Sequence, residues 1–274
     1  MKPLEPGVMF WAERDNLQEI RGLGVRCGQL GIAGDVEMSK AAADRWKADL
    51  AREQFTLVTM FAAYTGESYA DVPTVQRTVG FIPRDTRAER ERRTIELSDF
   101  AAQVGVPAIA CHIGFVPEDH ADPDYAAVRD LVRRICDHAA GHGQNFHLET
   151  GQEPADVLLA FFRDVNRPNL RINFDPANMI LYGTGEPIAA LRTLAAHVAS
   201  VHAKDGDWPP KDQADALGTE RPLGKGSVGI DKFVATLREV GFRGPVNVER
   251  ETENQAERLR DIGEAVKLLK KLTA

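Results

Sequence analysis

Short apolar runs alternate with longer helix-like segments along the whole chain, and this pair of segments is repeated eight times. The apolar runs are Val8–Trp11, Gly24–Leu30, Phe55–Ala62, Val106–Ile113, Asn145–Glu149, Leu170–Asp175, Ala199–Lys204 and Pro245–Glu249. The helix-like segments lie near Asp15–Gly22, Ser39–Gln54, Thr86–Val104, Asp122–His142, Pro154–Val165, Pro187–His197, Ile230–Val240 and Asn254–Leu272.

Strands that alternate with helices predict a parallel sheet, and eight such units in 274 residues favour a closed (β/α)8 barrel. We therefore expect one α/β TIM-barrel domain over residues 1–274. An open doubly wound sheet is the alternative, although no glycine-rich dinucleotide fingerprint follows the first strand.

The composition is that of an acidic protein of ordinary charge content. The formal net charge is −7 and 27% of the residues are charged, so the chain lacks the basic surface that nucleic-acid binding requires. The three cysteines form no metal-type pair, which predicts reduced thiols in a cytoplasmic protein. No apolar run reaches the ~18 residues of a membrane span, and the N-terminus lacks the apolar stretch of a signal peptide. The sequence leaves the oligomeric state open, homo-oligomers included.

Four consecutive strand-like runs in the second half of the chain end in a potential metal ligand. These ligands are Glu149, Asp175, His202 and Glu249. In a barrel of parallel strands, the carboxyl ends of the strands meet at one face, where active sites are built. Isolated buried carboxylates and imidazoles are costly in a core, whereas the same groups around one divalent cation are stable. We therefore expect one metal site. Side chains two positions earlier share the same face of each strand, so His147, Asn173, Ser200 and Asn247 are expected to orient the ligands.

The ligand types indicate which ion the site prefers. Three carboxylates and one imidazole form a hard to intermediate donor set that suits Mn²⁺ first, with Mg²⁺, Co²⁺ or Zn²⁺ as alternatives. A structural zinc site is not indicated, because no cysteine belongs to the set.

Five motifs in a fixed order resemble the xylose isomerase-like TIM-barrel superfamily, in its branch of sugar phosphate isomerases and epimerases. The motifs are His147-Leu148-Glu149-Thr150, Asn173-Phe174-Asp175-Pro176-Ala177-Asn178, Val201-His202-Ala203-Lys204-Asp205, Pro222-Leu223-Gly224-Lys225-Gly226 and Val248-Glu249. The resemblance covers essentially the whole chain. It implies a divalent metal on the four ligands named above, with the two glutamates also acting as acid and base. The sequence departs from the keto-sugar epimerases of this family at Asn178, where those enzymes usually have a histidine. An amide can bind a sugar hydroxyl but carries no proton at neutral pH.

Further residues are candidates for contacts with the substrate. His112 ends the fourth strand and is expected either to hold a substrate oxygen or to be packed in the core. Lys204 shares the face of His202, where it could stabilise an oxyanion or pair with a carboxylate. Trp208 is expected in a stacking wall with Trp11 and Phe115, and Arg221 is a candidate for binding a phosphate or carboxylate. The long connections Ala63–Asp85 and Asp205–Gly229 follow strand ends and are expected to cover the site.

These observations favour a metal-dependent isomerase or epimerase that acts on a ketose or keto-sugar. One glutamate would remove the hydrogen next to the carbonyl, the metal would hold the enediolate, and the other glutamate would return a proton. The same acid/base pair would also serve a lyase that eliminates the leaving group of a 3-keto-glycoside. Two further alternatives are a metal-dependent endonuclease, disfavoured by the acidic charge, and a sugar-binding protein without turnover.

Overall fold

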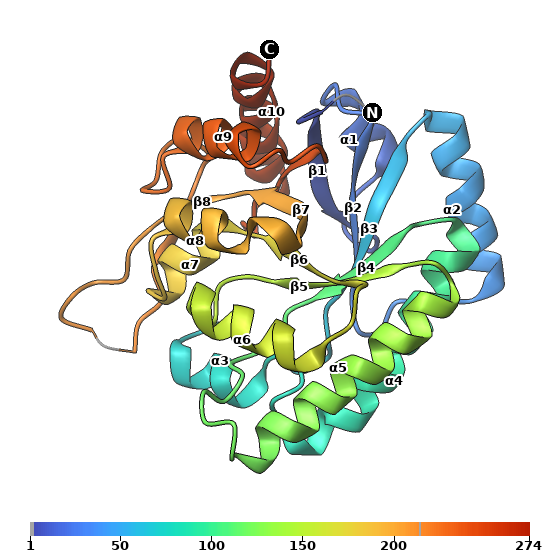
Figure 1. The fold of residues 1–274 in the computed structure, drawn as a ribbon. Coiled ribbons are helices and arrows are strands. Elements are labelled where there is room, and N and C mark those ends of the chain that lie inside the picture. Colours follow the sequence, from blue (N-terminus) through green and yellow to red (C-terminus); the bar gives the residue numbers. More distant parts are fainter. Residues whose placement is uncertain (1–2, 214) are drawn as a thin grey trace.

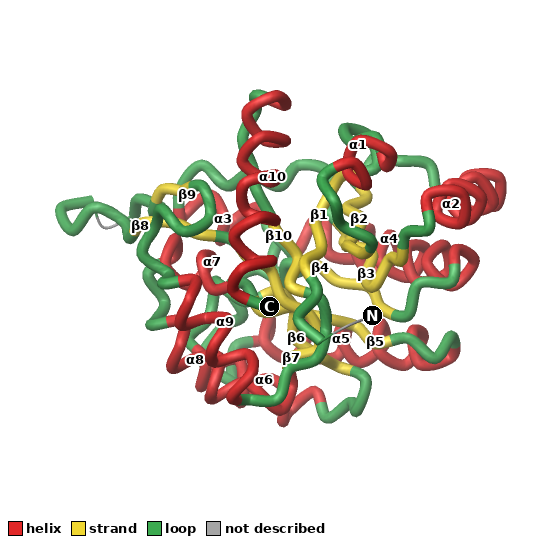
Figure 2. Tube along the Cα trace, turned by 90° about the horizontal axis from the view of Figure 1, so that it is seen from above, coloured by secondary structure: helices red, strands yellow, loops and turns green. Residues whose placement is uncertain are grey.

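The strands close into a parallel barrel in the order β1-β10-β7-β6-β5-β4-β3-β2, which confirms the predicted fold class. The computed structural model describes residues 3–213 and 215–274. The barrel strands are β1 Pro6–Trp11, β2 Cys27–Ile32, β3 Thr56–Ala62, β4 Ala108–Cys111, β5 Asn145–Glu149, β6 Leu170–Phe174, β7 Val198–Ala203 and β10 Val246–Val248. Viewed from above, the strands gather in the middle of the molecule with helices around them (Figure 2). An open doubly wound sheet is therefore excluded.

Each predicted helix is present, with ends that differ by a few residues from the expected ones. The helices that connect the barrel strands are α1 Leu17–Gly22, α2 Lys40–Glu53, α4 Arg84–Val104, α5 Pro123–Gly141, α6 Ala155–Val165, α8 Pro187–Leu194, α9 Ile230–Glu239 and α10 Gln255–Leu272. Helix-entry chemistry explains several starts, since Ser39 accepts from the Ala42 amide and Asp122 accepts from the Asp124 amide. Figure 1 shows the chain passing round the barrel from its N-terminus to the C-terminal helix α10, which lies near β1.

Four elements occur in segments that were expected to be loops. Helix α3, Val72–Thr78, lies in the connection after β3, and α7, Pro176–Tyr182, follows β6. Strands β8, Asp205–Asp207, and β9, Thr219–Arg221, pair antiparallel within the predicted loop Asp205–Gly229, of which Ala214 lies outside the described residues. Helix α7 has a clear physical cause: Asp175 accepts hydrogen bonds from the amides of Ala177 and Asn178, and Pro176 occupies the first turn.

The inside of the barrel contains many buried polar side chains at the level of the site. A large apolar core lies between strands and helices, while Met9, Phe61 and Ala110 form a separate small cluster with Trp11 packed against it. Buried polar side chains occupy the strands close by: Gln29, Thr59, His147, Asn173, Ser200, His202 and Asn247. Because polar groups in a core are stable only when they are paired, this layer marks the place where the fold supports a site.

A buried ion pair connects helix α10 to the segment that follows β1. Arg258 is 1% exposed and contacts the Asp15 carboxylate at 2.5 Å, while its Nε donates to the Arg250 carbonyl oxygen at 2.8 Å. Asp15 also accepts from the Trp11 amide at 2.8 Å. These contacts hold the segment after β10 against the end of β1. Within the described part of the chain, no helix has the length and apolar character needed to cross a membrane.

Candidate metal centre and substrate pocket

The four expected ligand side chains converge at the carboxyl ends of neighbouring barrel strands. Glu149 is the last residue of β5, Asp175 follows β6, His202 lies near the end of β7 and Glu249 follows β10. One ligand atom from each of them lies within 4.8 Å of those of the other three. Glu149, Asp175 and His202 are buried, and Glu249 is nearly so. The structure thus brings together residues up to 100 positions apart, as the strand-end pattern predicts.

The atoms of this cluster face a common centre and do not hydrogen-bond one another. His202 Nδ1 lies 2.7 Å from Glu149 Oε1, 3.0 Å from Glu249 Oε2 and 3.5 Å from Asp175 Oδ2. Despite these short separations, His202 Nδ1 and Asp175 Oδ2 are buried without a hydrogen-bond partner. Buried polar atoms rarely stay unpaired in native proteins, and such atoms often mark an ion. The donor set therefore fits a divalent cation.

A second layer of polar side chains determines how His202 presents its ring. The Nε2 of His202 contacts Gln29 Oε1 at 2.5 Å, which accepts its hydrogen and leaves Nδ1 facing the cluster. Gln29 Nε2 in turn donates to Asn173 Oδ1 at 2.9 Å, and Ser200 Oγ donates to the same oxygen at 2.6 Å. His147 Nδ1 lies 2.9 Å from Ser200 Oγ, and burial lowers the pKa of His147 to about 3, so its ring is neutral.

Four side chains were expected to orient the ligands, and three of them belong to this hydrogen-bonded layer. His147, Asn173 and Ser200 belong to it, and Asn173 also donates to Glu149 Oε1 at 3.4 Å. Asn247 instead donates to the Val201 carbonyl oxygen at 3.2 Å. Gln29 was not foreseen, although a single amide inside the apolar strand Gly24–Leu30 was a signal that the first half of the barrel contributes to the site.

Each glutamate of the cluster has a basic partner of its own. His112 Nε2 lies 2.9 Å from Glu149 Oε2, and Lys204 Nζ lies 3.0 Å from Glu249 Oε2. Burial alone would lower the pKa of His112, but the Glu149 carboxylate outweighs it and raises this pKa to about 9. Burial would likewise raise the pKa of Glu149, but His112 and His202 outweigh it and lower the pKa. Desolvation also opposes the charge on Lys204, yet Glu249 and nearby carboxylates raise its pKa well above the usual value.

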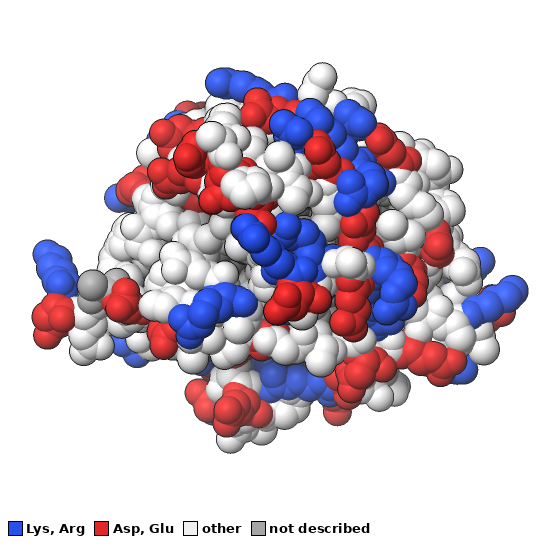
Figure 3. All heavy atoms as spheres, turned by 90° about the horizontal axis from the view of Figure 1, so that it is seen from below, with Lys and Arg blue, Asp and Glu red and all other residues white. Residues whose placement is uncertain are grey.

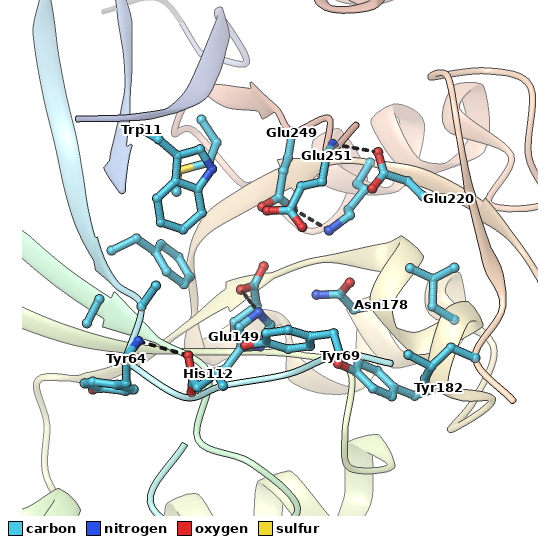
Figure 4. A pocket seen from close by; sticks show the side chains of 18 of the residues that line it. Trp11, Tyr64, Tyr69, His112, Glu149, Asn178, Tyr182, Glu220, Glu249 and Glu251 are labelled. Atoms are coloured by element: carbon cyan, nitrogen blue, oxygen red, sulfur yellow. Dashed lines mark hydrogen bonds and ion pairs between the residues drawn. The ribbon is translucent and has the colours of Figure 1, made fainter. Parts of the chain in front are cut away.

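A cavity of about 360 Å³ opens above the cluster and is lined by Glu149 and Glu249. Figure 4 shows Trp11 on one side and Tyr69 and Tyr182 on the other, with Glu220 and Glu251 near Glu249. Tyr69 comes from the connection after β3, which confirms that this connection covers the site. Leu217, Gly218 and Glu220 place part of the connection after β7 on the same cavity. The pocket combines aromatic walls with convergent polar groups, as small-molecule sites do.

The expected substrate contacts divide into two groups. His112, Asn178 and Lys204 line the cavity, whereas Trp208 and Arg221 are not among its lining residues. Trp208 is 44% exposed, and the Arg221 guanidinium contacts the Asp207 carboxylate at 2.7 Å. The reason is the β8–β9 hairpin: successive strand residues point to opposite sides, so Glu220 faces the cavity and Arg221 faces away. The structure therefore places Trp208 and Arg221 outside the cavity lining, and their roles as substrate contacts stay predictions.

The other aromatic candidates for the stacking wall also differ. Trp11 lines the cavity, while Phe115 packs edge-on against Tyr182 at a centroid distance of 5.7 Å. The sequence did not predict a role for Gln152. Its Nε2 lies 3.3 Å from His112 Nδ1 and 3.4 Å from the Tyr182 hydroxyl, so this side chain connects His112 with Tyr182. No strand periodicity identifies Gln152, because it lies in the turn after β5.

Comparisons with known proteins agree with this architecture. A family profile described as xylose isomerase-like TIM barrel matches residues 17–272. An L-ribulose 3-epimerase of Methylomonas sp. strain DH-1 is 29% identical over 150 residues, which cover 52% of this chain and 47% of that protein, so the match spans only about half of the relative. The solved structure of a xylose isomerase domain protein from Planctomyces limnophilus is 43% identical, with a TM-score of 0.95, over 99% of this chain and 98% of that one.

A more distant structure shows the same fold. A xylose isomerase-like TIM barrel protein from Mycobacterium smegmatis, in complex with magnesium, is 17% identical with a TM-score of 0.69 over 100% of this chain and 98% of that one. The matching profile spans nearly the whole sequence, and the closed barrel of parallel strands agrees with it. The chain therefore belongs to the xylose isomerase-like TIM barrel family.

Proposed function

We propose that the protein is a divalent-metal-dependent isomerase or epimerase of a carbohydrate, with Glu149 and Glu249 as its acid/base pair. One observation carries this proposal: two glutamates from separate strands flank one ligand cluster, and each contacts its own basic side chain. Glutamates that serve only as metal ligands do not each require a contact with a basic side chain, whereas both Glu149 and Glu249 have one. The similarity to an L-ribulose 3-epimerase over half of the chain supports a sugar substrate.

Glu149, Asp175, His202 and Glu249 would hold the metal ion, for which Mn²⁺ is the preferred candidate. When bound, a divalent cation polarises the substrate carbonyl and makes the neighbouring C–H bond more acidic. The two buried atoms without hydrogen-bond partners, His202 Nδ1 and Asp175 Oδ2, support this assignment. Gln29 would keep the His202 ring in the tautomer that a metal ligand needs.

The environment of each glutamate supports a division of proton-transfer work. The lowered pKa of Glu149 keeps its carboxylate ionised at neutral pH, and His112 orients the carboxylate through its Oε2 atom. Lys204 lies against Glu249 Oε2, where its positive charge would stabilise negative charge that develops on a substrate oxygen. One glutamate would remove the hydrogen next to the carbonyl, and the other would deliver a proton to the neighbouring carbon or to the opposite face.

The charges that line the cavity favour an uncharged sugar over a sugar phosphate. Among the described lining residues, five are glutamates, and the basic ones are His112 and Lys204. Both bases already contact the ligand glutamates, so a phosphate would meet carboxylates rather than a free cation. Tyr69, Tyr182 and Trp11 supply the apolar surfaces on which a sugar ring can rest.

The test is exchange of the substrate hydrogen with deuterated water, followed by NMR on a panel of free ketoses in the presence of Mn²⁺. The wild-type protein should exchange the hydrogen next to the carbonyl, and Glu149→Gln and Glu249→Gln should each lose this exchange. Glu239→Gln is the matched control, because Glu239 pairs with Arg192 on the outside of the barrel. Tight sugar binding without exchange in the wild type would indicate a binding protein and would overturn the proposal.

A lyase that acts on a 3-keto-glycoside is a second candidate, and a neighbouring cavity favours it. This second cavity, of about 460 Å³, shares Trp11, Ala63 and Glu251 with the first, so the two adjoin. A glycoside would place its leaving group there, and the same two glutamates would serve the elimination. Products that contain the released group, formed only from keto-glycosides, would select this function over epimerisation.

Charge argues against an endonuclease. Acidic side chains dominate the cavity, and on the face drawn in Figure 3 the Lys and Arg side chains alternate with Asp and Glu. Binding to a phosphate backbone draws its strength from Lys and Arg contacts, which such a mixture of charges does not favour.

A further inference from the structure

Three metal-binding side chains meet on the outside of the barrel, away from the pocket. Asp99 lies in α4, His138 lies in the last turn of α5, and His142 follows the end of that helix. The Nε2 atoms of His138 and His142 lie 2.7 Å and 2.8 Å from the same oxygen, Asp99 Oδ1. Helices α4 and α5 run side by side (Figure 1). The end of α5 leads into the start of β5, so this cluster and the pocket lie at opposite ends of the barrel.

The helix geometry explains why the two imidazoles meet. Residues four positions apart lie on one face of a helix, so His138 and His142 both face α4. Their ring centroids are 5.3 Å apart, with an angle of 74° between the ring planes, and both rings point their Nε2 atoms at one carboxylate oxygen. These two contacts are hydrogen bonds to one oxygen. One ligand atom from each of the three side chains lies within 4.8 Å of those of the other two, so a cation placed between them can replace the hydrogen bonds and contact all three.

We propose that Asp99, His138 and His142 form a second metal site, selective for Zn²⁺ and similar transition metals. Two imidazole nitrogens and one carboxylate are a donor set that suits zinc, with a fourth position open to water. The barrel cluster has three carboxylates and one imidazole and suits Mn²⁺ or Mg²⁺ better. The end of α5 adds a favourable term, because the C-terminal end of a helix dipole attracts cations. All three side chains are partly exposed, so an ion can enter from solvent.

A bound ion would join α4 to α5 and stabilise the fold without touching the reaction. An ion that binds the folded chain in preference to the unfolded chain raises stability by mass action. The inference does not depend on the proposed sugar chemistry, because none of the three residues lines the pocket.

The test is the number of ions bound per chain, measured by equilibrium dialysis and elemental analysis with Zn²⁺ and separately with Mn²⁺. The wild type should bind two Zn²⁺ and one Mn²⁺, and the variant with both His138→Ala and His142→Ala should bind one Zn²⁺ and one Mn²⁺. His202→Ala, which disables the barrel cluster, should keep one Zn²⁺. The matched control is His120→Ala, which removes a histidine that contacts Asp164 at 3.3 Å without a second imidazole, and it should still bind two Zn²⁺.

Thermal unfolding gives a second readout that requires no activity. Added Zn²⁺ should raise the unfolding temperature of the His202→Ala protein, and it should not do so when His138→Ala and His142→Ala are added to that variant. Circular dichroism checks that each variant is folded. The proposal is wrong if the His202→Ala protein binds no Zn²⁺, or if the variant lacking both histidines binds as many Zn²⁺ as the wild type.

Discussion

Replacing Gln29 with leucine tests whether the second layer of the barrel controls the metal ligand. Gln29 Oε1 accepts from His202 Nε2 and Gln29 Nε2 donates to Asn173 Oδ1, and Gln29 is fully buried. Leucine has a similar size but offers neither an acceptor nor a donor. The His202 Nε2–H is then left buried and unpaired, which costs about 1–3 kcal/mol of folding stability.

The same substitution should weaken metal binding, because the His202 ring can then carry its hydrogen on Nδ1, the atom that faces the other ligands. Loss of a partner that orients a metal-bound histidine typically lowers affinity by about 10–100-fold. This factor corresponds to about 1.4–2.7 kcal/mol of binding free energy. We expect Gln29→Leu to bind Mn²⁺ more weakly by that factor, as measured by competition with a fluorescent chelator.

Gln144→Leu provides the matched control for stability. Gln144 is also buried, bonds Ser98 and the Val106 carbonyl oxygen, and does not line the pocket. It should lose folding stability to a similar extent and keep the wild-type affinity for Mn²⁺. If Gln29→Leu loses stability but binds Mn²⁺ within threefold of the wild type, then Gln29 does not set the His202 tautomer.

Three further predictions address the chemistry, the pH dependence and the covering loop. Glu249→Gln should keep sugar binding and part of the metal binding but lose about 10²–10⁴-fold in turnover, measured by hydrogen exchange, because an amide cannot act as the base. Burial raises the pKa of Glu153 from 4.5 to about 8, so the folded state binds this proton more tightly than the unfolded state. Wild-type stability should therefore fall as the pH rises from about 4.5 to about 8, and Glu153→Gln should reduce that fall in urea unfolding at both ends of the range. Replacing residues 209–216 with a short linker should reduce turnover, because it alters the chain that leads into Leu217 and Gly218 of the cavity lining. The unfolding temperature should change much less, since β8 and β9 remain paired; equal losses would show that this loop is chiefly structural.

The barrel, and the convergence of the four candidate ligand side chains, could be predicted from the sequence because both depend on local patterns. Alternating strands and helices predict the barrel, and parallel strands bring their carboxyl ends together wherever they lie in the chain. The sequence therefore predicts that Glu149 and Glu249 lie beside His202, and the structure confirms that these side chains are close together.

The rest depends on how long connections fold, which local patterns do not encode. The hairpin formed by β8 and β9 places Glu220 at the pocket and Arg221 outside its lining, an orientation that the sequence of this connection did not reveal. Helix α7, Pro176–Tyr182, is too short to show a helical periodicity, although the local start signals Asp175 and Pro176 are present in the sequence. The sequence does not predict the role of Gln29, because its strand does not end in a ligand. The role depends on the closed barrel, which brings Gln29 of β2 into contact with His202 of β7.

The central claim is that one divalent ion is held by the four strand-end ligands, and anomalous diffraction at the manganese absorption edge tests it most directly. Crystals grown with Mn²⁺ should show a peak at about 2.0–2.3 Å from Glu149, Asp175, His202 and Glu249. In His202→Ala crystals the peak should be strongly reduced while the barrel is unchanged. A wild-type crystal with Mn²⁺ bound elsewhere, or with no peak between these four side chains, would contradict the account.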